Sequence, residues 1–388
     1  MKNILSWVLV LFLTVSLLNN CLSNKAQKEI NQKQSFMARL RELYASGNAS
    51  KWPVPMLDEE AKPYFSEIGH LPEIQFPTDN PYSSEKVILG KTLFYDPRLS
   101  GSNQIACASC HDPELGWCDN RMVSFGHDRQ VGTRNAMSIL NTAYATSLFW
   151  DGRAASLEEQ SQMPIQDQKE MSGHIDITVG KIAKIKGYET LFEKAFGDKA
   201  ITKERITKAM ATFERTVKSS PSKFDRFIDG EINLFTDDEV MGLHLFRTKA
   251  QCINCHNSGY FSNNRFENIG TSLLSSEQED VGRYLVTKKT EDVGKFRVPG
   301  LREAVRTGPW MHNGSFTSLT DIIQLYNKGN PEPYKNRTTI FNGVKLTSQK
   351  SDILRLLDLT DEEIMQLEMF LRTLSSKNQR IPPPVLPQ

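Results

Sequence analysis

The stretches Cys107-Ala-Ser-Cys110-His111 and Cys252-Ile-Asn-Cys255-His256 repeat one pattern, Cys-x-x-Cys-His, at two distant places in the chain. This pattern is the attachment signature of a c-type haem, in which two thiols bond the porphyrin and the adjoining histidine ligates the iron. A zinc ion held by the four thiolates is the alternative, but it would make both histidines incidental. A redox dithiol would need a βαβ context, which the sequence lacks. The repeat therefore predicts two covalently bound haem c groups.

Length and charge leave room for more than one domain and exclude some partners. The chain has 388 residues, which is enough for two or three domains with cores of their own. Its formal net charge of +1 gives no electrostatic argument for binding nucleic acid or an anionic membrane surface. Outside the repeated motif only Cys21 and Cys118 remain, so no disulfide framework is predicted. Cys118 is expected to be a small buried residue.

The N-terminus predicts export. Lys2 precedes an apolar stretch over residues 4–18, which is too short to span a bilayer comfortably and has the form of a signal-peptide core. Residues 1–22 are therefore predicted to be a signal peptide, and covalent haem attachment agrees with a periplasmic location. Cys21 stands where a lipoprotein cysteine would be lipidated, although Asn20 fits that signal poorly. Soluble and lipid-anchored forms both stay open.

Helix signals dominate the rest of the sequence. Three capping boxes, each a Ser or Thr followed three residues later by Glu, precede apolar stretches: Ser156 with Glu159, Thr236 with Glu239, and Thr360 with Glu363. An amphipathic stretch at Phe36, Leu40, Leu43 and Tyr44 predicts an N-terminal helix. Short helices are expected over 87–95 and 240–246, each ahead of one Cys-x-x-Cys-His motif. Alternation typical of β-strands is scarce.

The two motif segments look like a distant internal repeat, because each follows a short predicted helix and precedes a long loop region. We predict an all-α fold of two cytochrome c-like domains with long loops, over residues 84–235 and 236–376, each wrapping one haem. The helical stretch over 201–217 is expected to join them. Residues 23–83 are predicted to form an N-terminal helix and an extended linker, and residues 377–388 a Pro-rich tail.

The residues around the motifs resemble the bacterial dihaem cytochrome c peroxidase and MauG superfamily. The similarity runs from about Leu89 to Leu374 and keeps its spacing. Its main segments are Leu89-Gly-Lys-Thr-Leu-Phe-Tyr-Asp-Pro-Arg-Leu-Ser100, Phe149-Trp150-Asp151-Gly152-Arg153, Phe296-Arg297-Val298-Pro299 and His312-Asn313-Gly314-Ser315. The resemblance implies that the first haem meets peroxide and that the second delivers electrons.

The resemblance also implies roles for residues near the first motif. His111 would ligate the first iron, and His127 would cap its distal face at rest and move away on activation. Glu170 would carry the proton that peroxide cleavage requires, with Gln160 as a hydrogen-bonding neighbour and Pro164 shaping the pocket.

Two further roles concern the region between the haems. By the same resemblance, the indole of Trp150 would bridge electron transfer. Asn135, together with backbone carbonyls of Arg297 and Pro299, would hold a calcium ion between the domains.

The second haem departs from the ordinary pattern. His256 would be its proximal ligand, but the position that carries Met in ordinary dihaem peroxidases is Tyr326 here, as in MauG-like members. A phenolate ligand would stabilise ferric iron and lower its potential. Met311, which falls out of register in the Trp310-Met311-His312 turn, is the alternative ligand, and an open site is a third alternative.

Three functions follow from these residues. The leading hypothesis is a dihaem cytochrome c peroxidase that reduces hydrogen peroxide with electrons from a small donor such as a monohaem cytochrome c. Tyr326 keeps open a MauG-like oxidase that uses ferryl equivalents on a protein substrate. A non-catalytic dihaem electron carrier is the third, but a carrier would need no proton shuttle such as Glu170 and Gln160. A homodimer is left open, because the family is often dimeric.

Overall fold

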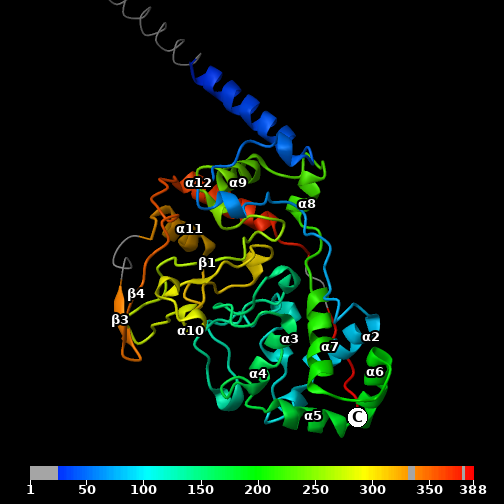
Figure 1. Ribbon diagram of the computed structural model, residues 1–388. Coiled ribbons are helices and arrows are strands. Elements are labelled where there is room, and N and C mark those ends of the chain that lie inside the picture. Colours follow the sequence, from blue (N-terminus) through cyan, green and yellow to red (C-terminus); the bar gives the residue numbers. More distant parts are fainter. Residues whose placement is uncertain (1–24, 331–336, 378–380) are drawn as a thin grey trace, which may run out of the picture.

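The computed structural model describes residues 25–330, 337–377 and 381–388. Within these ranges the chain is mostly helical, as expected from the sequence (Figure 1). It also contains two short antiparallel two-stranded ladders, which the predicted all-α fold did not include. The predicted signal peptide and Cys21 lie outside the described residues. Among the residues described, no helix combines the length and the apolarity that crossing a membrane requires.

Each Cys-x-x-Cys-His motif belongs to a core that is built on a crossed pair of helices. In the first half α2 (Ser84–Phe94) packs on α7 (Lys203–Thr216). In the second half α9 (Asp237–Arg247) packs on α12 (Asp361–Thr373). Figure 1 shows α9 and α12 above, and α2 and α7 below.

Both helix pairs meet at a glycine. A Cβ on Gly90 would lie 1.9 Å from the carbonyl oxygen of Ala209, and a Cβ on Gly242 would lie 2.0 Å from that of Gln366. Only a residue without a side chain lets the two backbones approach this closely. The two halves thus share one kind of helix crossing.

The predicted helix starts are present in the structure. Thr236 begins α9 and Thr360 begins α12, each in a reciprocal capping box with the glutamate three residues later. At α3 (Leu157–Gln160) the Ser156 hydroxyl accepts from the backbone N–H of Glu159, and only this half of the box forms. Local capping therefore places these helix ends as the sequence indicates.

The stretch over 201–217 does not join the two halves. As α7, it lies in the first core, where Ile206, Ala209 and Met210 are fully buried against α2 and its neighbours. The helix is therefore part of the first core and not a separate connector. The other labelled α-helices are α4 (Met163–Gln166), α5 (Ile175–Ala183), α6 (Lys186–Phe196), α8 (Lys223–Ile228), α10 (Tyr284–Thr287) and α11 (Leu319–Asn327).

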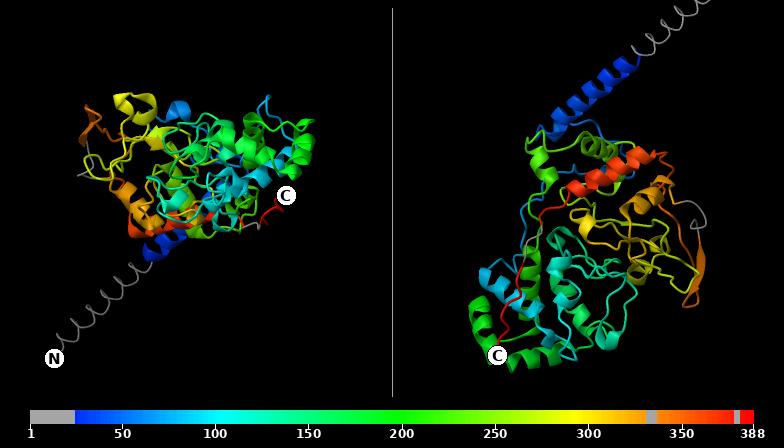
Figure 2. Two further views of the ribbon diagram at one scale, coloured as in Figure 1. Left: turned by 90° about the horizontal axis from the view of Figure 1, so that it is seen from below. Right: turned by 180° about the vertical axis from the view of Figure 1, so that it is seen from behind.

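The N-terminal segment lies on the second half, although it precedes the first half in sequence. Residues 25–44 are helical, and their first turns project from the body (Figures 1 and 2). At the other end Tyr44 is fully buried, and its hydroxyl hydrogen-bonds His244 of α9 at 3.0 Å. Further on, the backbone N–H of Met56 donates to the Arg247 carbonyl at 2.9 Å. The stretch expected to be a linker is thus packed on the second core.

The four strands are short. β1 (Phe266–Glu267) pairs with β2 (Phe296–Arg297) beside the second motif. β3 (Thr338–Phe341) and β4 (Val344–Thr347) form a hairpin whose Asn342-Gly343 turn has positive φ at both residues, 47° and 80°. This turn type favours Asn-Gly.

The Pro-rich tail returns to the first half. The Arg98 guanidinium donates to the carbonyl of Pro387 at 2.9 Å, and the Gly187 N–H donates to that of Gln388 at 3.1 Å. Figure 2 shows this segment running from the second half along the first. Residues 381–388 therefore form an extended strap across the two halves.

Two candidate haem sites

The two motifs have the same local structure. Each cysteine pair is set in a 3-10 turn, η4 (Cys107–Ser109) and η8 (Cys252–Asn254). In each turn the backbone N–H of the motif histidine donates to the carbonyl of the first cysteine, at 3.0 Å for His111 and 2.8 Å for His256. One tight loop therefore gathers two thiols and one imidazole.

The histidine rings are oriented as metal ligands usually are. Nδ1 of His111 hydrogen-bonds the carbonyl of Trp117 at 3.2 Å, and Nδ1 of His256 hydrogen-bonds that of Phe261 at 3.1 Å. With Nδ1–H donating to a carbonyl, Nε2 keeps its lone pair for iron. Burial lowers the pKa of both imidazoles, that of His256 to about 4, which favours the neutral form that ligates a metal.

A cavity of about 180 Å³ adjoins the first motif. Its wall brings together residues that are distant in sequence and that the sequence analysis singled out: Cys107, Cys110, His111, Trp150, Gln160, Pro164 and Glu170. Gln160 ends α3 and Pro164 lies in the first turn of α4, where proline costs no helical hydrogen bond. Two short consecutive helices, α3 and α4, thus present Gln160 and Pro164 to the same cavity.

Glu170 has the environment of a proton carrier. Burial, and then the neighbouring Asp167 carboxylate, raise the pKa of Glu170, whereas the cationic Arg153 opposes this shift. No described residue donates a hydrogen bond to its carboxyl group. A carboxyl in this position holds a proton more readily than an exposed glutamate does.

A second carboxyl, that of Glu214, lines the same cavity and was missed by the sequence analysis. Burial raises the pKa of Glu214 to about 8. Of its charged neighbours, Arg215 opposes this shift and Glu158 adds to it. A signal was present in the sequence. Glu214 stands four residues after Met210, which is on the buried face of α7, so an acidic residue interrupts an apolar stripe.

His127 lies near the first cavity but is not part of its wall. Its backbone N–H donates to the carbonyls of Lys169 and Glu170 at 3.0 and 2.8 Å. Its Nε2 is 3.3 Å from the carboxylate of Asp128. The loop of His127 is thus attached to the Glu170 segment, while Gly126 beside it does line the cavity.

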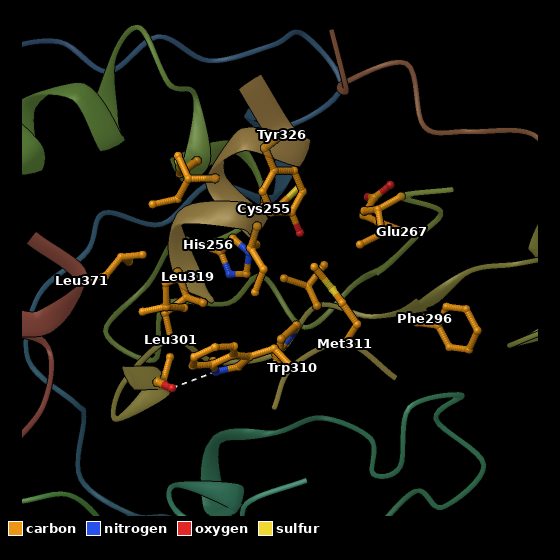
Figure 3. A pocket seen from close by; sticks show the side chains of 18 of the residues that line it. Cys255, His256, Glu267, Phe296, Leu301, Trp310, Met311, Leu319, Tyr326 and Leu371 are labelled. Carbon is orange, nitrogen blue, oxygen red and sulfur yellow. Dashed lines mark hydrogen bonds between the residues drawn. The ribbon is translucent and has the colours of Figure 1, made fainter. Parts of the chain in front are cut away.

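A second cavity, of about 260 Å³, adjoins the second motif. Cys252, Cys255 and His256 line it together with Tyr326 of α11 and Met311. Figure 3 shows Tyr326 and Met311 both facing this cavity. The sequence predicts that Met311 is out of register, but the fold brings it into the same wall as Tyr326. Burial, and then the two cysteines of the motif, raise the pKa of the Tyr326 hydroxyl.

Three of the predicted residues lie at the junction of the cavities. Trp150, Asn135 and Arg297 line both cavities, whereas Pro299 lines the second. The Trp150 indole N–H donates to the Asn135 carbonyl at 3.0 Å, and the Arg297 N–H donates to the Trp150 carbonyl at 2.8 Å. In the described ranges, no group of three or more His, Cys, Asp or Glu side chains is placed to hold a metal ion. The predicted calcium ligands, an amide and carbonyls, are of another kind.

Both donor sets fit a covalently attached haem. The four motif thiols are free of disulfide bonds, and burial raises the pKa of the Cys107 and Cys252 thiols. Each motif opens onto its own cavity, with an imidazole fixed through Nδ1. Two thiols for the porphyrin and one neutral imidazole for the iron are the set that a c-type haem requires.

Comparisons with known proteins agree with this geometry. The family described as di-haem cytochrome c peroxidase matches residues 84–233. The methylamine utilization protein MauG of Methylophilus methylotrophus is 34% identical over 317 residues, covering 81% of this chain and 90% of that protein. The cytochrome c551 peroxidase of Nitrosomonas europaea is 32% identical over 308 residues, covering 79% of this chain and 85% of that one.

A solved structure also resembles the fold. The crystal structure of a MauG-like protein associated with microbial copper homeostasis superposes with a TM-score of 0.70 at 30% identity, covering 79% of this chain and 94% of that one. The chain therefore belongs to the dihaem cytochrome c peroxidase and MauG superfamily.

Proposed function

We propose that the protein is a dihaem peroxidase that reduces hydrogen peroxide to water with electrons from a small donor such as a monohaem cytochrome c. One observation carries this proposal: Glu170, a carboxyl with no described hydrogen-bond donor and a raised pKa, lines the first cavity beside Gln160. A pure electron carrier would have no use for such a group. Relatives that are named cytochrome c peroxidases support the same assignment.

Each motif would hold one haem c. Cys107 and Cys110 would bond the first porphyrin and His111 would ligate its iron, and the second motif would act in the same way. When bound, the first haem supplies the iron at which the peroxide O–O bond is cleaved. These two groups would belong to two cytochrome c-like domains over 84–235 and 236–376.

The reaction consumes two electrons and two protons for each peroxide and yields two waters. In our proposal the Glu170 carboxylate accepts the proton of the peroxide oxygen that binds and returns it to the oxygen that leaves. Water then leaves in place of hydroxide, which is the costlier leaving group. The Gln160 carboxamide would orient the peroxide by hydrogen bonding, and Pro164 would limit the space around it.

The second cavity would serve electron entry. Trp150, which lines both cavities, would supply an aromatic path between them. His127 would act as a removable cap on the first site, and its loop is already attached to the Glu170 segment. We also propose that Asn135 and the nearby carbonyls hold a calcium ion. The protein would be periplasmic, with or without a lipid on Cys21, and it would form a homodimer.

Tyr326 favours a second candidate function. Its hydroxyl faces the second cavity, and no described residue forms a hydrogen bond with it (Figure 3). As a ligand, a phenolate would stabilise oxidised iron and lower the potential of the second site. A site of that kind suits a MauG-like oxidase acting on a protein substrate, whereas Met311 as ligand would suit an ordinary peroxidase.

Steady-state turnover of hydrogen peroxide with reduced cytochrome c tests the proposed function. Glu170→Gln removes the proton carrier but keeps the shape of the side chain, and we expect kcat/KM to fall about 10²–10⁴-fold. Glu193→Gln, on the exposed face of α6, is the matched control and should leave turnover unchanged.

The result is interpreted only after both haems have been counted by absorbance. Full haem content with no turnover in the wild type, for any small donor, would rule out the peroxidase. Equal turnover in Glu170→Gln and the wild type would show that Glu170 takes no part in the reaction.

A further inference from the structure

The junction between the two cavities holds a buried cation without a counter-ion. Arg297 is only 4% exposed, and its guanidinium has two weak contacts, 3.4 Å from Nε to the Phe149 carbonyl and 3.3 Å to the sulfur of Met137. The other terminal nitrogen, Nη1, is buried and has no partner among the described residues. The side chain lines both cavities.

The other arginines of the two cavity walls differ from Arg297 in this respect. Each of them is paired with a carboxylate: Arg134 with Asp151 and Asp280, Arg153 with Asp151, Arg302 with Asp225, and Arg355 with Asp58. Within the part of the chain that the structure describes, Arg297 is the exception among the wall arginines. Its missing partner is therefore a property of this position and not of the cavities in general.

A buried unpaired charge is costly in a protein interior, so a guanidinium in this place calls for an anion. The backbone holds it there firmly. Arg297 pairs with Phe266 in the β1–β2 ladder, and its N–H donates to Trp150 at 2.8 Å. A guanidinium is a planar fork that matches carboxylates, and it is less strongly hydrated than an ammonium.

The haems that the cavities would hold supply such anions, because every haem c carries two propionate carboxylates. We propose that Arg297 is a shared counter-ion for propionates of both haems and that it couples the charge states of the two sites. This inference rests on haem occupancy of both cavities and not on peroxide turnover. A failure of the proposed peroxidase activity would leave it untouched.

The charge of Arg297 would act on the redox potentials of both haems. A fixed positive charge favours the reduced form of a nearby iron, since reduction adds a negative charge. A cation that serves both haems therefore raises both potentials. Its removal should lower both, whereas the loss of a merely structural arginine would weaken folding without moving two potentials in one direction.

Spectroelectrochemical titration of the haem-loaded protein tests the proposal. We expect both midpoint potentials of Arg297→Gln to shift to more negative values. In Arg297→Lys, both should shift in the same direction by a smaller amount, because an ammonium keeps the charge but lacks the fork. Arg265→Gln is the matched control, because Arg265 is exposed and its carbonyl accepts from the Val298 N–H on the neighbouring strand. Solvent screens its charge, so both potentials should move far less than in Arg297→Gln.

A shift at one haem alone, or at neither, would overturn the assignment. So would an equal shift in Arg265→Gln, since any lost positive charge would then have the same effect. Haem content and thermal unfolding are measured on each variant first. If Arg297→Gln does not load both haems, Arg297→Lys is used to test the proposal instead. The criterion is the same: the midpoint potentials of both haems must shift to more negative values.

Discussion

The two Cys-x-x-Cys-His regions have one framework and two different sets of cavity-lining side chains. In both, a glycine lets two helices cross in contact, and the motif imidazole is fixed through Nδ1 to a backbone carbonyl. The first cavity, however, is lined by the carboxyls of Glu170 and Glu214, whose pKa values are both raised, whereas the second is lined by Tyr326 and Met311 together with the carboxyl of Glu267. The comparison teaches that the shared framework places the iron-binding groups, while a few wall residues determine what each site can do.

The shared framework is expected to show the largest effect on stability. Gly90→Ala and Gly242→Ala would each place a methyl group about 2 Å from a backbone carbonyl oxygen of the partner helix. We expect each to lower the free energy of unfolding by roughly 3 kcal/mol, even though alanine favours helix formation, because two helices must separate. Thermal unfolding of the purified protein measures this.

Gly180→Ala is the control for these two variants. Gly180 lies in α5 with no atom near its missing side chain, so alanine should be neutral or stabilising by up to about 1 kcal/mol. If Gly90→Ala and Gly242→Ala were as stable as Gly180→Ala, the two helix crossings would not be the common framework.

The second site should respond to Tyr326→Met. A thioether favours ferrous iron, so we expect the midpoint potential of the second haem to rise on the order of 0.1 V while that of the first stays in place. Redox titration monitored by EPR resolves the two sites. An unchanged second potential, together with a change in Met311→Leu, would assign the ligand to Met311 and bring this site closer to that of an ordinary peroxidase.

Glu214 should give a smaller, pH-dependent effect at the first site. Its pKa is raised to about 8 in the folded protein, so the folded state holds a proton that the unfolded state has already lost. Stability therefore falls as pH rises from the ordinary glutamate range towards 8. Glu214→Gln lacks this loss and should be more stable than the wild type at pH 8, on the order of 1–2 kcal/mol.

Urea unfolding at pH 5 and pH 8 checks the Glu214 prediction. At pH 5 the variant and the wild type should differ much less. The same difference at both pH values, or a variant that is less stable at pH 8, would show that the Glu214 carboxyl is not kept protonated by its surroundings.

Local signals in the sequence predicted part of this molecule well. The capping boxes at Thr236 and Thr360 mark real helix starts, and the family was recognisable from spaced motifs. The Asn342-Gly343 turn between two β-branched stretches was an equally local signal of a hairpin, and it was overlooked. Such features depend on a few neighbouring residues, so they can be inferred without the fold.

Features that depend on distant contacts could not be inferred in this way. Met311 and Tyr326 meet only because a turn and α11 converge on one cavity. The orphaned guanidinium of Arg297 is visible only when the partners of every neighbouring arginine are known. The sequence predicts that the helix over 201–217 is a connector, because periodicity shows that a helix has an apolar face but not which core buries it.

The central claim is that peroxide reacts at the first cavity and not at the second. The most direct test is the rate of peroxide consumption in a single turnover, measured by stopped flow on haem-loaded protein whose two irons have been reduced beforehand, so that they supply the two electrons without an added donor. The account predicts that Glu170→Gln slows this step about 10²–10⁴-fold and that Tyr326→Met changes it far less. A step that survives in Glu170→Gln but is lost in Tyr326→Met would contradict the account.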